Sequence, residues 1–158
     1  MELSEFASYS VKKLSGGMKR RLLIARALIH NPKIIFMDEP TVALDPQVRR
    51  KIWNLIEDLR KGGATIILTT HYIEEAEKLC QNIAMLKNGK LLAVDSPKNF
   101  CERLGKFIVE FENVGEKSHK FFCDKISAEN FLKDFKGMIR ATTLEDVFVE
   151  LIANDKFS

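Results

Sequence analysis

Two short apolar runs, separated by one helix-length segment, most constrain the fold of this 158-residue chain. "KIIFMD" covers residues 33–38 and "ATIILTT" covers residues 64–70. A continuously apolar run this short is typical of a strand buried on both faces, as in a parallel sheet. The segment between the runs begins with Asp45 and Pro46, which are cap and first-turn residues, and ends at Gly62-Gly63. Because its apolar residues also have helical spacing, the pattern predicts a strand–helix–strand unit and an α/β fold.

The rest of the chain continues the alternation of helices and strands. We expect further helices over residues 15–30, 72–80, 97–104, 127–135 and 143–153. We expect a pair of strands at residues 82–87 and 90–95, joined through the turn at Asn88-Gly89, and an edge strand at residues 106–112. The pattern weakens after Asp95, so we predict two domains, residues 1–104 and a small α+β appendage over residues 105–158.

Composition limits the class of protein. The chain is 46% hydrophobic and 30% charged, which is typical of a globular protein, and its net charge of +3 does not argue for nucleic acid. The odd number of cysteines, Cys80, Cys101 and Cys123, predicts reduced thiols rather than a disulfide framework. There is no apolar run of bilayer length and no signal-peptide pattern, so we expect a soluble chain that can still dock on a membrane partner.

Polar residues follow both apolar runs. Asp38 and Glu39 come at the end of the first run, where ligand sites of open α/β sheets lie, and paired acids there suit a metal ion or a proton. The alternative is that they begin a solvated loop. His71 follows the second run and would share the same sheet edge, although a lone histidine is commonly just a polar residue at a strand end. Asp45 alone is best explained as a helix cap, and a second role is compatible with capping.

Four motifs in fixed order resemble the ATPase subunit of ATP-binding cassette (ABC) transporters. The resemblance runs from about Ser10 to Ser96 and implies the C-terminal part of a P-loop NTPase domain with a mostly parallel sheet. The matching residues are Leu14-Ser15-Gly16-Gly17 (the signature), Ile34 to Glu39 (the Walker B strand), Ala43-Leu44-Asp45 (the D-loop) and His71 (the switch histidine).

The C-terminal segment resembles one branch of that family. "TLEDVFVEL", residues 143–151, and "LSGGMKRRL" look like ATPases that serve drug, antibiotic and polysaccharide exporters. The alternative for residues 143–151 is an ordinary amphipathic helix with a threonine cap.

The resemblance implies a role for each motif residue. Asp38 would hold Mg²⁺, Glu39 would polarise the attacking water as general base, and His71 would contact the γ-phosphate of ATP. Asp45 would link two subunits near the reaction centre.

The signature would act as an anion site. Ser15, Gly16 and Gly17 would offer backbone N–H groups at a helix N-terminus to the γ-phosphate of ATP held by the opposite subunit. We expect Lys19, Arg20 and Arg21, on the first turns of that helix, to form a solvated face and interdomain contacts.

Two motifs of the family are absent from the sequence. A phosphate-cradling loop reads Gly-x-x-x-x-Gly-Lys-Ser/Thr, and Gly-Lys occurs only at residues 89–90 and 105–106 without the rest of that pattern. The Q-loop is absent too. We therefore expect a truncated frame, a split gene or a fragment, or else a short protein that lends its signature and Glu39 in trans to a chain carrying the P-loop. The isolated chain should bind Mg-ATP weakly or not at all and be inactive. It should also be prone to aggregation unless it dimerises or finds its other half.

The sequence thus predicts an ATP-binding and hydrolysing subunit that couples ATP hydrolysis to export. Its expected partners are a membrane permease and a second ATPase subunit, with no nucleic acid, and its expected location is cytoplasmic and peripheral at the inner face of the membrane. One alternative is a catalytically incompetent binding or regulatory module with the same fold. The other is an ABC protein that acts on ribosomes or DNA, which the modest net charge and the residue 143–151 segment disfavour.

Overall fold

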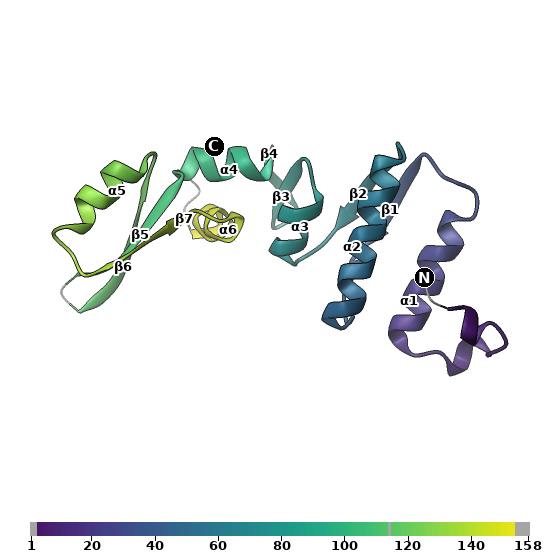
Figure 1. Ribbon diagram of the computed structural model, residues 1–158. Coiled ribbons are helices and arrows are strands. Elements are labelled where there is room, and N and C mark those ends of the chain that lie inside the picture. The colour runs from purple at the N-terminus through teal and green to yellow at the C-terminus, as the bar shows by residue number, and fades with distance from the viewer. Residues whose placement is uncertain (1–2, 114, 154–158) are drawn as a thin grey trace. The chain divides into compact units, whose positions relative to one another are not determined.

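The computed structural model describes residues 3–113 and 115–153, which divide into two compact units (Figure 1). Unit 1 ends at Tyr72 and unit 2 begins at Ile73. The predicted domains, residues 1–104 and 105–158, have a different boundary. The two compact units are defined by packing alone, so the predicted domains stay a prediction.

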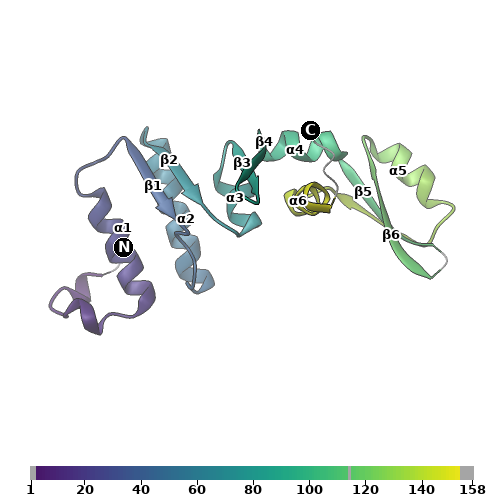
Figure 2. The same ribbon diagram turned by 180° about the vertical axis from the view of Figure 1, so that it is seen from behind.

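Unit 1 contains the predicted strand–helix–strand unit. Strands β1 and β2 pair in parallel, so that Ile34 lies opposite Thr65 and Asp38 opposite Thr69. Helix α2 lies on one face of this two-stranded sheet in both ribbon views (Figures 1 and 2). The elements of unit 1 are η1 (Ser4–Phe6), η2 (Val11–Lys13), α1 (Gly16–Leu28), β1 (Ile34–Asp38), α2 (Pro46–Lys61) and β2 (Thr65–Thr69).

The two helices of unit 1 begin as predicted, with side-chain caps. The Ser15 hydroxyl accepts a hydrogen bond from the Met18 N–H at 3.2 Å, and the Asp45 carboxylate accepts from the N–H groups of Gln47 and Val48. Each cap satisfies backbone donors that a helix N-terminus otherwise leaves unpaired. Helix α2 then buries its apolar stripe, which consists of Ile52, Trp53 and Ile56.

The sheet of unit 1 has one covered face and one open face. Ile35 and Met37 are buried, whereas Ile34 is 58% and Phe36 is 75% exposed. Ile67, the partner of Phe36 on β2, is 49% exposed on the same open face. The prediction that the run at residues 33–38 is buried on both faces is therefore wrong for the described chain, because unit 1 covers only one face with helices.

Unit 2 contains two antiparallel sheets and the remaining helices. Strands β3 and β4 form the predicted hairpin, and its turn residues, Asn88 and Gly89, both have positive φ. The elements of unit 2 are α3 (Ile73–Leu79), β3 (Ile83–Lys87), β4 (Lys90–Asp95), α4 (Pro97–Leu104), β5 (Phe107–Asn113), β6 (Glu116–Phe122), α5 (Lys125–Leu132), β7 (Gly137–Ala141) and α6 (Leu144–Ala153).

Strand β5 is the centre of a three-stranded sheet ordered β6-β5-β7. The prediction of an edge strand at residues 106–112 is wrong, because β6 and β7 pair with it on both sides. Neither flanking strand was predicted: "EKSHKFF" is largely polar and "GMIRA" contains a glycine. That glycine, Gly137, lies so close to β5 that an added Cβ would come within 2.1 Å of the Glu110 carbonyl oxygen.

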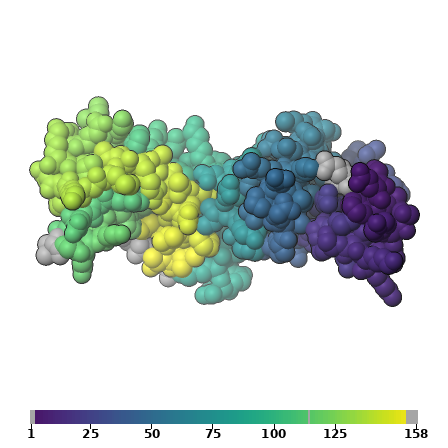
Figure 3. Space-filling view, turned by 60° about the horizontal axis from the view of Figure 1, so that its bottom comes forward, coloured from purple at the N-terminus to yellow at the C-terminus, as the bar shows by residue number. Residues whose placement is uncertain are grey.

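The core of unit 2 joins the hairpin to α4 and α6. Its buried members are Met85, Phe100, Leu144, Val147 and Leu151. Helix α6, which contains the yellow residues of Figure 3, packs against α3 and α4 of the same unit. No helix within residues 3–113 and 115–153 is long and apolar enough to cross a membrane.

Candidate functional site

The carboxyl ends of β1 and β2 form the candidate site in unit 1. Asp38 is the last residue of β1 and Thr69 is the last residue of β2, and the Thr69 hydroxyl donates a hydrogen bond to the Asp38 carboxylate. Asp38 lies two residues after Phe36, so the alternation of the strand sends both side chains to the open face. Sequence reasoning did not select Thr69, which no motif distinguishes from other strand threonines.

Glu39 and His71 meet at this edge. The Glu39 Oε1 atom lies 2.9 Å from Nδ1 of His71, and the Glu39 N–H donates to the Thr69 carbonyl oxygen at 3.0 Å. The structure thus brings together three of the residues selected from the sequence, Asp38, Glu39 and His71. It does so because parallel strands end at one edge of a sheet.

The environment of His71 fixes its ring. The imidazole is tilted against the Tyr72 ring with 4.2 Å between centroids, and the Arg49 guanidinium lies 4.6 Å from the centre of that Tyr72 ring. Since Nδ1 is engaged by Glu39, Nε2 is the nitrogen that can meet an incoming ligand. His71 is 61% exposed as a side chain, so a ligand can reach it.

The two carboxylate oxygens of Glu39 differ. Oε1 is paired with His71, whereas Oε2 is shielded from solvent and has no hydrogen-bond partner within the described part of the chain. A buried acceptor without a donor is costly, and a bound water or ligand is a common reason for one. Oε2 is therefore suited to accept a hydrogen bond from a water molecule.

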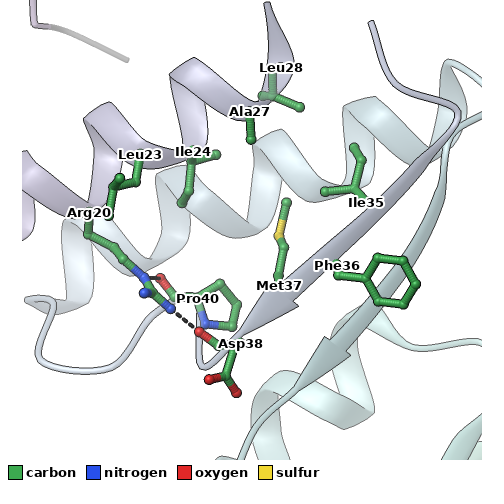
Figure 4. Close-up of a pocket in the computed structure, with 10 residues that line it drawn as sticks. All are labelled: Arg20, Leu23, Ile24, Ala27, Leu28, Ile35, Phe36, Met37, Asp38 and Pro40. Carbon is green, nitrogen blue, oxygen red and sulfur yellow. Dashed lines mark hydrogen bonds between the residues drawn. The ribbon is translucent and has the colours of Figure 1, made fainter. Parts of the chain in front are cut away.

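Arg20 reaches this edge from α1. Its guanidinium donates to the carbonyl oxygens of three consecutive residues, Asp38, Glu39 and Pro40. Figure 4 shows the contact with Asp38. The prediction that Arg20 is part of a solvated or interdomain face is wrong, because α1 packs along β1 and turns this side chain inward. Lys19, its neighbour, is exposed as predicted.

The signature residues lie at the start of α1. Ser15 caps the helix, and a Cβ added at Gly16 would meet nothing within 4 Å, so packing in the described chain does not require a glycine there. A Cβ at Gly17 would come within 3.2 Å of Leu44, the residue before Asp45. The signature segment therefore touches the loop that leads into α2, and Asp45 caps that helix as the simpler reading predicted.

The groove between α1 and β1 is too small and too apolar for a nucleotide. Its volume is about 170 Å³, below the several hundred Å³ typical of ligand pockets (Figure 4). Its walls are Arg20, Leu23, Ile24, Ala27, Leu28, Ile35, Phe36, Met37, Asp38 and Pro40.

The donor set at the sheet edge fits a magnesium–phosphate ligand better than a metal caged by protein. Within residues 3–113 and 115–153 there is no group of three or more His, Cys, Asp or Glu side chains that could hold a metal ion. Magnesium commonly takes one or two carboxylates and completes its shell with water and substrate phosphates. A single carboxylate beside a hydroxyl, as in Asp38 and Thr69, matches that requirement.

Comparison with known proteins gives consistent matches over nearly the whole chain. A Nod factor export ATP-binding protein I from Rhizobium sp. (strain N33) is 37% identical, with the alignment covering 97% of this chain and 58% of the relative. The protein of the same name from Cupriavidus pinatubonensis is 45% identical, covering 97% of this chain and 54% of the relative. The chain thus spans somewhat more than half the length of these curated relatives.

A family model and solved structures match as well. The model described as "AAA domain, putative AbiEii toxin, Type IV TA system" matches residues 5–75. The dimeric post-hydrolysis structure of the ATP-binding cassette MJ0796 bound to ADP and Pi aligns with a TM-score of 0.54 and 37% identity, over 59% of this chain and 40% of that one. An ATP-binding subunit of an ABC transporter aligns with a TM-score of 0.61 over 89% of this chain and 45% of that one, at 22% identity, which supports the fold alone. The chain belongs to the ATP-binding cassette family of ATP-binding proteins and has the α/β fold of its ATPase domains.

Proposed function

We propose that this chain provides the signature and hydrolysis residues of an ABC ATPase that drives export through a membrane permease. The observation that carries the proposal is the Glu39–His71 contact, 2.9 Å between Oε1 and Nδ1, beside Asp38 at the carboxyl edge of a parallel sheet. The names of the curated relatives, export ATP-binding proteins, support the direction of transport.

The chemistry divides among the residues at the sheet edge. Asp38 would hold Mg²⁺ with the help of the Thr69 hydroxyl, and the ion would supply positive charge that stabilises the phosphates of ATP. Glu39 accepts a proton from the attacking water through Oε2, the oxygen that has no partner within the described residues. His71 keeps Glu39 oriented through Nδ1 and meets the γ-phosphate through Nε2.

The phosphates need a second binding element, which the 158 residues do not contain. The open face of the sheet, with Phe36 and Ile67 exposed around Asp38, is where a segment bearing a P-loop would pack. That segment is either a further part of the same polypeptide, as the greater length of the relatives suggests, or a separate chain. Ser15, Gly16 and Gly17 would then face the ATP of a second ATPase subunit, and Asp45 would lie near the contact between the two subunits.

Work on material from the source cells tests this function. We would tag the C-terminus, isolate the protein with whatever polypeptide or partner accompanies it, and measure phosphate release from Mg-ATP. We expect hydrolysis by the wild type and a loss of about 10²- to 10⁴-fold in kcat for Glu39→Gln, with ATP still bound. Glu129→Gln on α5, half exposed, is the matched control and should hydrolyse at the wild-type rate.

Two results would overturn the proposal. Nucleotide binding without any wild-type hydrolysis would favour the non-catalytic module. Salt-sensitive copurification with ribosomes or DNA, without a membrane protein, would favour an ABC protein that acts on ribosomes or DNA. A calorimetric titration of the isolated chain with Mg-ATP gives a further check, since tight binding would contradict the need for a separate P-loop segment.

A further inference from the structure

We propose that Arg20 is a positioning residue that holds Glu39 in its reactive orientation and ties that orientation to the start of α1. This inference rests on the proposed ATPase function and concerns how its general base is kept in place. Arg20 stands at a point where three carbonyl oxygens, those of Asp38, Glu39 and Pro40, converge on one guanidinium.

The hydrogen bonds of Arg20 differ from those of a surface ion pair, because one guanidinium binds several backbone carbonyl oxygens. Nη2 of Arg20 donates to the Glu39 carbonyl oxygen at 2.5 Å and also to that of Asp38, while Nε lies 3.4 Å from that of Pro40. A guanidinium carries five N–H donors in a rigid planar fork, so one side chain can satisfy several acceptors at fixed relative positions. A lysine in the same place could offer donors from a single point only.

The held segment needs outside support. Glu39 has φ of +48°, in the left-handed region that a residue with a side chain rarely adopts, and the rigid, buried Pro40 follows it. Such a conformation persists only when its surroundings enforce it. Thr69 holds the Glu39 N–H from the β2 side at 3.0 Å, and Arg20 holds the carbonyl groups from the α1 side.

This support originates in the signature helix. Arg20 lies one turn after Gly16 and Gly17 on α1, and a helix transmits displacement along its axis with little internal change. A ligand that displaces the first N–H groups of α1 therefore also moves the Arg20 guanidinium, which donates a hydrogen bond to the Glu39 carbonyl oxygen. The orientation of Glu39 would in this way depend on whether a ligand is bound at the signature residues at the start of α1.

Steady-state kinetics on the isolated holo-assembly test the inference. We expect Arg20→Ala to lower kcat for ATP by about 10- to 100-fold, the size of effect that follows from misplacing a catalytic group by about 1 Å, with KM within about twofold of wild type. Arg20→Lys should fall between Arg20→Ala and the wild type. Lys19→Ala removes an equal charge from an exposed neighbour on the same helix and should leave kcat unchanged.

A double-mutant cycle separates positioning from general destabilisation. If Arg20 acts through Glu39, adding Arg20→Ala to Glu39→Gln should not slow the residual hydrolysis further. A wild-type kcat in Arg20→Ala would overturn the inference. It would also be overturned if Arg20→Ala slowed hydrolysis equally in the wild-type and the Glu39→Gln proteins. Should Arg20→Ala fail to fold by circular dichroism, a wild-type kcat in Arg20→Lys would overturn it instead.

The controls also separate this inference from the proposed function. If wild type hydrolyses ATP and Glu39→Gln does not, while Arg20→Ala matches wild type, only the role of Arg20 fails. If the wild type itself does not hydrolyse ATP, the ATPase function fails and the inference fails with it.

Discussion

Nδ1 of His71 lies 2.9 Å from Oε1 of Glu39, and the two residues follow neighbouring parallel strands. The pair is therefore held by the backbone of β1 and β2 rather than by loops that could drift apart. Because one ring nitrogen is occupied by the carboxylate, the imidazole has a defined orientation toward any ligand at the sheet edge.

The Glu39–His71 pair predicts the behaviour of a histidine variant. His71→Ala removes the partner of Oε1 and the group proposed to meet the γ-phosphate, so we expect kcat to fall by about 10²-fold or more while ATP binding persists. Phosphate release measured on the tagged assembly gives the rate. His30→Ala, at an exposed position outside the site, should behave as wild type. Equal rates for both variants and wild type would remove His71 from the mechanism.

Gly16 offers a test of the signature that leaves the fold intact. A Cβ at this position meets nothing within 4 Å in the described structure, and alanine favours a helix over glycine by up to about 1 kcal/mol. We therefore expect Gly16→Ala to melt at or slightly above the wild-type temperature by circular dichroism. The same variant should lose ATP-dependent dimerisation, followed by light scattering, because the methyl group blocks the close approach of a phosphate. Normal dimerisation would argue against an anion site at this helix start.

The open face of unit 1 predicts self-association of the isolated chain. Phe36 is 75% exposed on an apolar face beside Ile34 and Ile67, and the outer edges of the two-stranded sheet are unpaired within the described residues. Such a patch on such a sheet favours aggregation. We expect Phe36→Ser to reduce the association seen in sedimentation velocity without lowering stability. Ile126→Ser is the matched control, because Ile126 is exposed on α5 and should have no effect on association.

A partly buried ion pair in unit 2, between Arg140 and Asp146, predicts acid sensitivity. Burial acts to raise the pKa of Asp146, but hydrogen bonds from Arg140 and from the N–H and hydroxyl of Thr143 outweigh it and lower the pKa to about 2, from the ordinary 3.8. A carboxylate with a lowered folded-state pKa contributes stability above its unfolded pKa and loses it as the pH falls through the folded pKa. The contribution, about 2 kcal/mol, should therefore be present above about pH 4 and fade toward pH 2.

Urea unfolding at several pH values checks this acid sensitivity. Asp146→Asn should be less stable than wild type at pH 6, and the gap should narrow between pH 4 and pH 2. Glu116→Gln, exposed on β6, should track wild type throughout. A gap that stays constant with pH would mean that the charge of Asp146 does not matter.

The sequence predicted well the features that depend on local patterns and on the rule for parallel strands. The apolar runs and Asp45 located β1, β2 and α2, and the shared sheet edge brought His71 to Glu39 without any knowledge of contacts. The threonine cap of α6 was the alternative interpretation of residues 143–151, and the structure contains such a cap, because the Thr143 hydroxyl accepts a hydrogen bond from the Asp146 N–H at 3.4 Å.

The features that depend on docking were not predictable. Nothing in "MKRRL" distinguishes the arginine at position 20 from its neighbours until α1 lies along β1. The polar β6 strand owes its existence to pairing with β5 rather than to its own composition. An apolar run also cannot reveal that one face of its strand is uncovered, since periodicity reports hydrophobicity and not the presence of a neighbour.

The alternation of β1 has a consequence for control of this protein. Phe36 and Asp38 are two residues apart and so share one face, which places the bare apolar patch and the proposed magnesium ligand on a single surface. Any polypeptide that covers the apolar patch around Phe36 must also lie next to Asp38. Under the proposed function, assembly and nucleotide loading would then be one event as seen from this chain.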